Sequence, residues 1–175
     1  TSATGPPHGC RSRSADRNGP NAPFAEAVAS SLMTMRNRVV FDADVTLSMP
    51  VDRVWAELVD WGGHGRWIPM TRVEVDAADP NRFVAWSGVG PLALEDRMHA
   101  TQLEFDGSRG TCHVDKIGPV LLGFATLTVT GDASRTRVQW HEDVTVPYVP
   151  RFLTPVVAKA SGMLFGFALK RLKKA

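Results

Sequence analysis

The sequence predicts an α+β fold, in which a curved antiparallel sheet of about seven strands surrounds one long C-terminal helix. Residues 39–47 alternate apolar and polar side chains, which is the period of a half-buried strand. Strand-like segments separated by short, turn-rich breaks fill the chain from 70 to 146. Residues 152–169 are mostly apolar and are followed by basic residues, as is typical of a helix packed on a sheet.

Two short helices are expected directly after the first strand. Pro50 is able to open a helix, Ser48 is suited to capping it, and apolar residues within 51–59 recur three to four positions apart. Residues 60–69 form a glycine-rich link with room for one more helical turn. The link lacks the lysine of a phosphate-binding loop, so we interpret it as a tight connection.

Six further strands follow, each bounded by turn-forming residues. Breaks such as Asp79-Pro80-Asn81 and Asp106-Gly107-Ser108 are short, which suits antiparallel hairpins. The predicted strands are 70–76, 82–88, 92–104, 110–117, 122–130 and 136–146.

The terminal helix carries an apolar stripe that we expect to face the sheet. Its members are Leu153, Val156, Val157, Ala160, Met163, Leu164, Phe167 and Ala168. On the opposite side, Gly162 and Gly166 permit close backbone approach, which suits a dimer contact or the N-terminal segment and is equally compatible with chance. Lys159 near the middle makes membrane insertion costly. We therefore predict a buried helix of a soluble domain and no stable membrane insertion.

The chain divides into an N-terminal extension, residues 1–35, and a folded domain, residues 36–175. Residues 1–23 are rich in Gly, Pro, Ser and Arg, which predicts disorder, whereas residues 24–35 could form a short helix. Met33 and Met35 stand directly before the first strand, which is compatible with a start or processing site in this region.

Composition argues against several classes of function. The chain has 20 Lys and Arg against 18 Asp and Glu, a net charge of +2 that is too small to predict a nucleic-acid partner. No signal-peptide pattern is visible and Cys10 and Cys112 are expected to be reduced, so we expect a cytoplasmic protein. The five histidines lack the spacing of a metal site, and no cofactor is expected.

Several segments in this order carry a family resemblance. A strand is followed by Met49-Pro50-Val51-Asp52-Arg53-Val54-Trp55, by Asp60, and by Trp67-Ile68-Pro69 before the next strand. Gly88-Val89-Gly90-Pro91 then precedes a long strand. With these segments, residues 38–174 resemble the START-like, or SRPBCC, superfamily with its helix-grip fold, and most of all its polyketide cyclase/dehydrase-type and lipid-transport-type members. The resemblance implies binding of a hydrophobic small molecule, and in some members cyclisation or dehydration.

Alternation along two strands places carboxylates on the faces that point toward the helix. One face of the last strand consists of Val138, Trp140, Glu142, Val144 and Val146. The expected inner face of the strand from 92 consists of Leu92, Leu94, Asp96, Met98 and Ala100.

A carboxylate in a largely apolar pocket is harder to ionise, which suits general acid–base chemistry. Glu142 and Asp96 are therefore the catalytic candidates, and we expect Glu142 to have little salt-bridge compensation. The alternative, in which they lie at the wet mouth of the pocket or pair with an arginine such as Arg97, stays open. Ligand contact is predicted for the large apolar residues Trp86, Leu94, Met98, Trp140, Val144, Met163 and Phe167.

Two functions are consistent with these observations. The first is a carrier or sensor that binds a hydrophobic molecule, such as a lipid, polyketide or isoprenoid, between sheet and helix. The alternative is an enzyme, a polyketide aromatase/cyclase or dehydratase, with Glu142 or Asp96 as acid–base and Trp140 as a wall. Whether the chain is catalytic, the identity of its ligand and its oligomeric state, including a homodimer, are left open by the sequence.

Overall fold

The computed structural model describes residues 37–88, 90, 93–146 and 149–174. The predicted extension, residues 1–35, lies outside the described residues, and so does Cys10.

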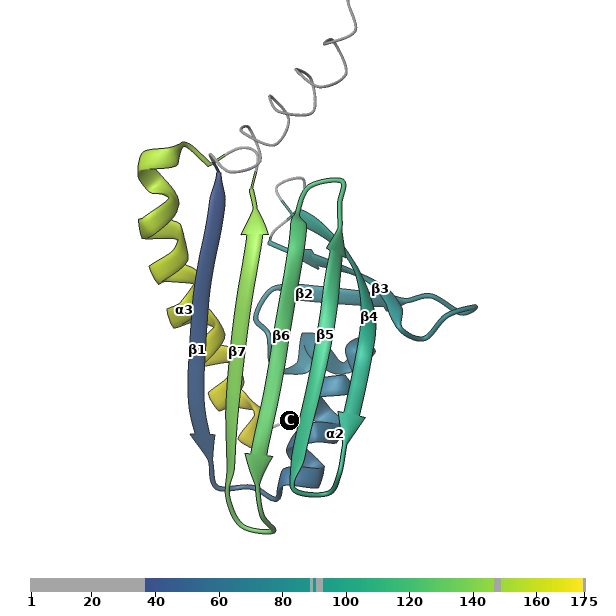
Figure 1. The fold of residues 1–175 in the computed structure, drawn as a ribbon. Coiled ribbons are helices and arrows are strands. Elements are labelled where there is room, and N and C mark those ends of the chain that lie inside the picture. Colours follow the sequence, from purple (N-terminus) through teal and green to yellow (C-terminus); the bar gives the residue numbers. More distant parts are fainter. Residues whose placement is uncertain (1–36, 89, 91–92, 147–148, 175) are drawn as a thin grey trace, which may run out of the picture.

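Seven antiparallel strands form one curved sheet in the order β1-β7-β6-β5-β4-β3-β2 (Figure 1). Two short helices follow β1 and a long helix follows β7, so the predicted α+β fold is confirmed. The strands are β1 (Arg38–Leu47), β2 (Thr71–Val75), β3 (Arg82–Ser87), β4 (Leu94–Phe105), β5 (Arg109–Ile117), β6 (Leu122–Gly131) and β7 (Thr136–Thr145). The helices are α2 (Val51–Val59), η1 (Trp61–Arg66), η3 (Arg151–Leu153), α3 (Thr154–Arg171) and η4 (Leu172–Lys174).

Strict alternation of buried and exposed residues sets the concave face of the sheet. In β1 every second residue from Val39 to Leu47 is buried, and the intervening residues face solvent. The inner residues of β7 include Val138, Trp140 and Glu142, all buried as the alternation predicted. Because side chains alternate across a strand, one apolar face commits the whole strand to one register against the core.

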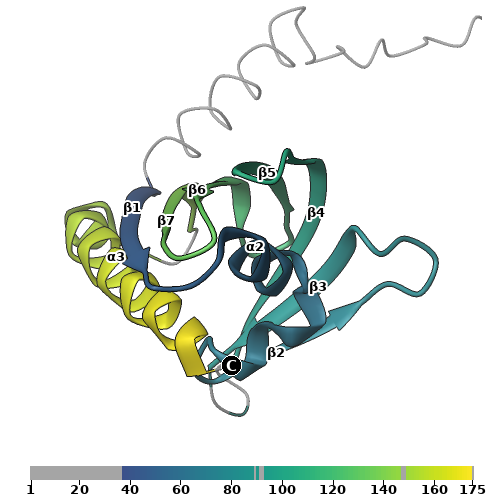
Figure 2. The ribbon, with the colours of Figure 1, turned by 90° about the horizontal axis from the view of Figure 1, so that it is seen from below.

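Helix α2 covers one end of the concave face and lies inside the curve of the sheet (Figure 2). It begins after Pro50, and the expected cap from Ser48 is not made, because no side chain caps this end. Instead, the Val51 N–H donates to the carbonyl of Asp132 at 2.9 Å, which ties the start of the helix to the β6–β7 turn. Val51, Val54 and Leu58 form its buried face.

Helix α3 runs beside β1 and apart from α2 (Figure 2). The face that α3 buries differs from the predicted apolar stripe. Phe165 lies with its ring 5.3 Å from that of Phe41 and 5.0 Å from that of Trp140. Ala168 and Leu169 are buried on the same side. Of the other large apolar residues in the predicted stripe, Val157 is partly buried against the core. The rest are exposed: Leu153, Val156, Met163, Leu164 and Phe167.

The helix is apolar nearly all round, so hydrophobicity could not identify the packed face. The face of α3 that packs on β1 is determined by small residues, which allow the two backbones to approach closely. A Cβ atom on Gly162 would lie 2.9 Å from the carbonyl oxygen of Asp42, whereas one on Gly166 would meet nothing within 4 Å. The expected close backbone approach is therefore present at Gly162, and its partner in the structure is β1.

Replacing Gly162 with alanine should destabilise the domain, because the new methyl group must push α3 away from β1. We expect a loss of about 1–3 kcal/mol in the free energy of unfolding, the usual cost of overpacking. Gly166→Ala is the matched control and should be neutral or stabilising by up to about 1 kcal/mol, because alanine favours the helix. Urea denaturation of both variants checks this. Equal stabilisation by the two substitutions would contradict the contact.

Candidate ligand-binding site

A cavity of about 430 Å³ lies between the concave face of the sheet and α3. Its walls are mostly apolar and come from β1, β3 to β7, the η1–β2 segment and α3. Phe41, Trp140 and Phe165, which pack on one another where α3 meets the sheet, form one side. This volume falls within the range of pockets that hold small organic ligands.

Four of the predicted ligand-binding residues line this cavity. They are Leu94 and Met98 on β4 and Trp140 and Val144 on β7. All four lie on the inner faces that the alternation assigned, because the antiparallel register keeps these positions on one side of the sheet. Their contact with a ligand stays a prediction.

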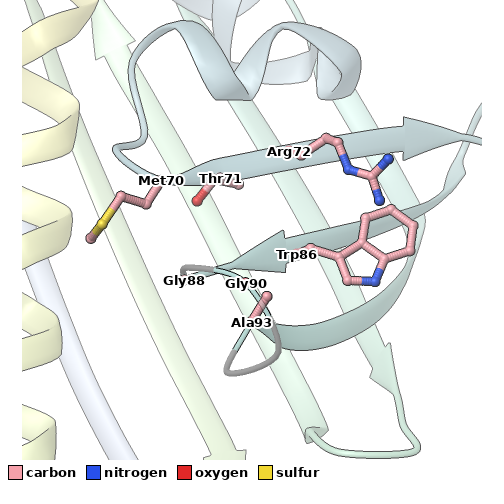
Figure 3. Close-up of a pocket in the computed structure, with 7 residues that line it drawn as sticks. All are labelled: Met70, Thr71, Arg72, Trp86, Gly88, Gly90 and Ala93. Atoms are coloured by element: carbon pink, nitrogen blue, oxygen red, sulfur yellow. The ribbon is translucent and has the colours of Figure 1, made fainter.

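The other three predicted residues do not line the cavity, and their expected placement is corrected. Trp86 is on the opposite face of β3 from Phe83 and Ala85, and the guanidinium of Arg72 lies 4.4 Å over its ring (Figure 3). Met163 and Phe167 are 68% and 56% exposed, because α3 turns its other side toward β1.

The cavity shares part of its lining with a more open hollow beside β2 and the start of β4. This hollow is lined by residues that include Met70, Thr71 and Gly88, which also line the cavity (Figure 3). Met70 is 66% exposed and has a φ of 54°, a left-handed conformation that is uncommon outside glycine. Its carbonyl accepts a hydrogen bond from the Gly88 N–H at 2.9 Å, which joins the segment before β2 to the end of β3.

A buried ionic cluster of Asp96, Lys116 and Glu142 stands on the cavity wall. The Lys116 Nζ lies 3.2 Å from Glu142 Oε1 and also donates to Asp96 Oδ2. The Trp140 Nε1–H donates to Glu142 Oε2 at 3.1 Å. Relative exposures of the Lys116 and Glu142 side chains are only 4% and 5%, so these contacts are screened little by solvent.

The sheet register explains how three strands deliver one cluster. Lys116 on β5 is separated from β7 by β6, where Gly123 and Ala125 stand opposite Lys116 and Glu142 respectively. The lysine side chain reaches across β6 to the glutamate past the small side chain of Ala125. Gly123 is required by the backbone instead, because a Cβ atom there would clash with the carbonyl of Asp143. Asp96 reaches the same ammonium from β4, two positions from Met98, which is the register partner of Lys116.

Electrostatics within the cluster favours a charged lysine and a carboxyl that is reluctant to ionise. Burial alone would lower the pKa of the Lys116 ammonium, but the charges of Glu142 and Asp96 raise it above its ordinary value. Burial also raises the pKa of the Asp96 carboxyl, and the attraction of Lys116 offsets only part of this effect. Asp96 Oδ1 is buried and has no hydrogen-bond partner among the described residues.

The inward placement of Asp96 and Glu142 is thus as predicted, but the expectation of little salt-bridge compensation for Glu142 is wrong. Sequence reasoning missed Lys116. The signal was present in β5, where Cys112, Val114 and Lys116 alternate on the buried face. A lysine in a strand is normally assigned to the solvent face, and only the meeting of two carboxylates from other strands gives it a reason to point inward.

Two other buried side chains, His64 and Cys112, have pKa values that burial shifts. Burial lowers the pKa of His64, whose Nε2 lies 2.9 Å from the carbonyl of Leu58, so a neutral imidazole lines the cavity floor. Burial raises the pKa of the Cys112 thiol to about 12, which makes it a poor nucleophile. Within the described ranges, no group of three or more His, Cys, Asp or Glu residues gathers as metal ligands would.

Comparison with known proteins identifies the family. The sequence model of the family described as polyketide cyclase/dehydrase and lipid transport matches residues 38–175. No curated protein sequence matches the chain.

Solved structures share the fold at low sequence identity. A START superfamily protein from Mycobacterium smegmatis has a TM-score of 0.61 and 14% identity, over 77% of this chain and 97% of that one. The Zhui aromatase/cyclase from Streptomyces sp. R1128 has a TM-score of 0.53 and 18% identity, over 78% and 93%. The di-domain aromatase/cyclase BexL of the BE-7585A biosynthetic pathway has a TM-score of 0.56 and 17% identity, over 77% of this chain and 46% of BexL.

These likenesses concern the fold alone, which is the seven-stranded sheet with a long C-terminal helix described above. The family match covers the whole of that fold and includes every residue of the cavity. The chain therefore belongs to the polyketide cyclase/dehydrase and lipid transport family and has the START-like helix-grip fold.

Proposed function

We propose that the protein binds and carries a neutral hydrophobic small molecule, of lipid, polyketide or isoprenoid type, in the cavity between sheet and α3. The observation that carries the proposal is a largely apolar cavity of about 430 Å³ with its charged groups gathered in one cluster on the wall. An apolar body gains free energy by burial in such a space, and a few placed polar groups fix its orientation.

The charge of the cluster narrows the chemistry of the ligand. One ammonium faces two carboxylates, so a fully ionised cluster carries a net negative charge. An anionic head group would be repelled, since Lys116 already pairs with both carboxylates. A hydroxyl or N–H group would instead donate to Asp96 Oδ1, the buried oxygen without a partner among the described residues. The preferred ligand therefore has an apolar body and one hydrogen-bond donor.

A second candidate, a polyketide aromatase/cyclase or dehydratase, is favoured by the same cluster. A carboxylate beside a fixed ammonium is suited to removing a proton next to a carbonyl, while the ammonium stabilises the oxygen that becomes negative. Family membership is compatible with both functions. We place the carrier first because both carboxylates are already engaged by Lys116.

A fluorescent probe tests the carrier function. N-phenyl-1-naphthylamine is neutral and apolar with one N–H, and it should bind in the cavity with a rise in fluorescence. Ser161 lines the cavity from α3, so Ser161→Phe fills it and should weaken binding by about tenfold or more. Ala160→Phe adds the same ring to the exposed side of the helix and is the control. Equal binding by all three proteins would place the probe elsewhere and overturn the proposal.

Glu142→Gln separates the two candidate functions, because it removes a charge and keeps the shape. For a carrier, affinity for the neutral probe should stay within a few fold or improve, since the negative charge of the cluster falls. For an enzyme, turnover of a poly-β-keto substrate, followed by chromatography, should be lost while affinity is retained. Detectable turnover by the unsubstituted chain that Glu142→Gln and Asp96→Asn both abolish would favour the second candidate.

Lys116→Met should destabilise the domain strongly, because it leaves two buried carboxylates without their cation. The expected loss in the free energy of unfolding near pH 7 is about 3–5 kcal/mol. The loss should shrink as the pH falls toward 4, since a carboxyl whose pKa is raised takes up a proton in the folded chain. Urea denaturation at several pH values checks this, with the exposed Lys159→Met as control. A loss independent of pH would contradict an ionic role for Lys116.

A further inference from the structure

Helix α3 has an exposed apolar side that the ligand-binding function does not use. We define the outer face of α3 as Val156, Ala160, Met163 and Phe167, on the side of the helix turned away from β1, together with Phe152 of the preceding η3. The four large residues of this face are 78%, 63%, 68% and 56% exposed. A contiguous apolar patch of this kind on a domain surface marks an interaction site.

Basic residues occur along this helix and its ends, and acidic residues do not. Residues 151–173 include Arg151, Lys159, Lys170, Arg171 and Lys173 and contain no Asp or Glu. The guanidinium of Arg171 lies 6.0 Å over the Phe167 ring, at the edge of the outer face. An apolar face bordered by cations is the composition that lies on an anionic lipid surface, where the apolar side chains enter the acyl boundary and the cations meet the head groups.

We infer that the outer face of α3 docks the domain on the surface of an anionic lipid bilayer. The charge pattern disfavours a second copy of this chain, because two such helices would bring together cations with no acidic partner. Among the described residues, Arg151–Arg171 is the one helix long and apolar enough to cross a bilayer. Spanning would require α3 to leave β1, whereas Phe165, Ala168 and Leu169 hold its inner side on the domain.

The position of the cavity gives this docking a consequence. Leu164, next to the outer face, lines the cavity and is 51% exposed, so the cavity wall is continuous with the docking surface. A domain lying on lipid through α3 would have this wall at the membrane, where an apolar ligand could pass without crossing water. The docking surface itself does not depend on the proposed function, because it stands on residues outside the cavity.

Cosedimentation of the full chain with vesicles tests the inference. Vesicles of phosphatidylcholine with phosphatidylglycerol should bind the protein, and pure phosphatidylcholine vesicles should bind it at least about tenfold more weakly, since each basic residue near an anionic surface adds affinity. Binding to the mixed vesicles should fall as salt is raised. No binding to either vesicle overturns the inference, including the case in which another part of the full chain covers the face.

Matched variants assign the surface. Met163→Gln with Phe167→Gln should weaken binding about tenfold or more, because each side chain loses its burial in lipid. Leu103→Gln with Val75→Gln changes two apolar residues that are 39% and 41% exposed elsewhere and should have little effect. A triple charge reversal at the end of the helix, with Glu in place of Lys170, Arg171 and Lys173, should abolish selectivity for anionic vesicles. The same reversal at Arg53, Arg109 and Arg135 is the control and should preserve this selectivity.

Three results with these variants would overturn the inference. They are equal loss in the test and control pairs, equal binding to neutral and anionic vesicles, and a dimer in analytical ultracentrifugation that Met163→Gln with Phe167→Gln dissolves. The last result would assign the outer face to a second copy of the chain. Circular dichroism of each variant, with an unchanged unfolding temperature, establishes that lost binding is not lost folding.

Discussion

The buried ammonium of Lys116 is the constraint on which the interior depends. A charge taken out of water must be paired, and the structure pairs this one with carboxylates from two other strands. That pairing carries the lysine side chain across β6 to Glu142, and it leaves the second oxygen of Asp96 buried without a partner among the described residues. The polar wall of an otherwise apolar cavity therefore follows from one lysine.

The second constraint is the contact between α3 and β1. Gly162 brings the helix backbone against Asp42, and Phe165 fills the space between Phe41 and Trp140. The same contact closes one side of the cavity and turns Met163 and Phe167 outward. The cavity and the exposed apolar face are thus two sides of one helix, which would link the proposed ligand site to the proposed docking surface.

Strand positions could be predicted from the sequence because alternation is a local signal. It assigned the inner faces of β4 and β7 correctly, including Asp96, Glu142, Trp140 and Met98. The predicted placement of Trp86 is wrong because both faces of β3 carry apolar residues, so hydrophobicity does not show which face of this strand points inward. The prediction of the packed face of α3 was wrong for a similar reason, because the small residues that determine this face contribute little hydrophobicity. Lys116 needed the three-dimensional meeting of β4, β5 and β7, which no local pattern contains.

The curved sheet and α3 enclose the cavity, and Asp96, Lys116 and Glu142 form its polar wall. We propose that a neutral hydrophobic ligand binds in the cavity with its donor on the cluster. A crystal structure of the chain with N-phenyl-1-naphthylamine tests it most directly. We expect the naphthyl ring to lie between Trp140 and Met98, with the amine N–H of the probe donating to Asp96 Oδ1. A probe bound on the outer face of α3 alone, with the cavity closed by collapsed side chains, would contradict it.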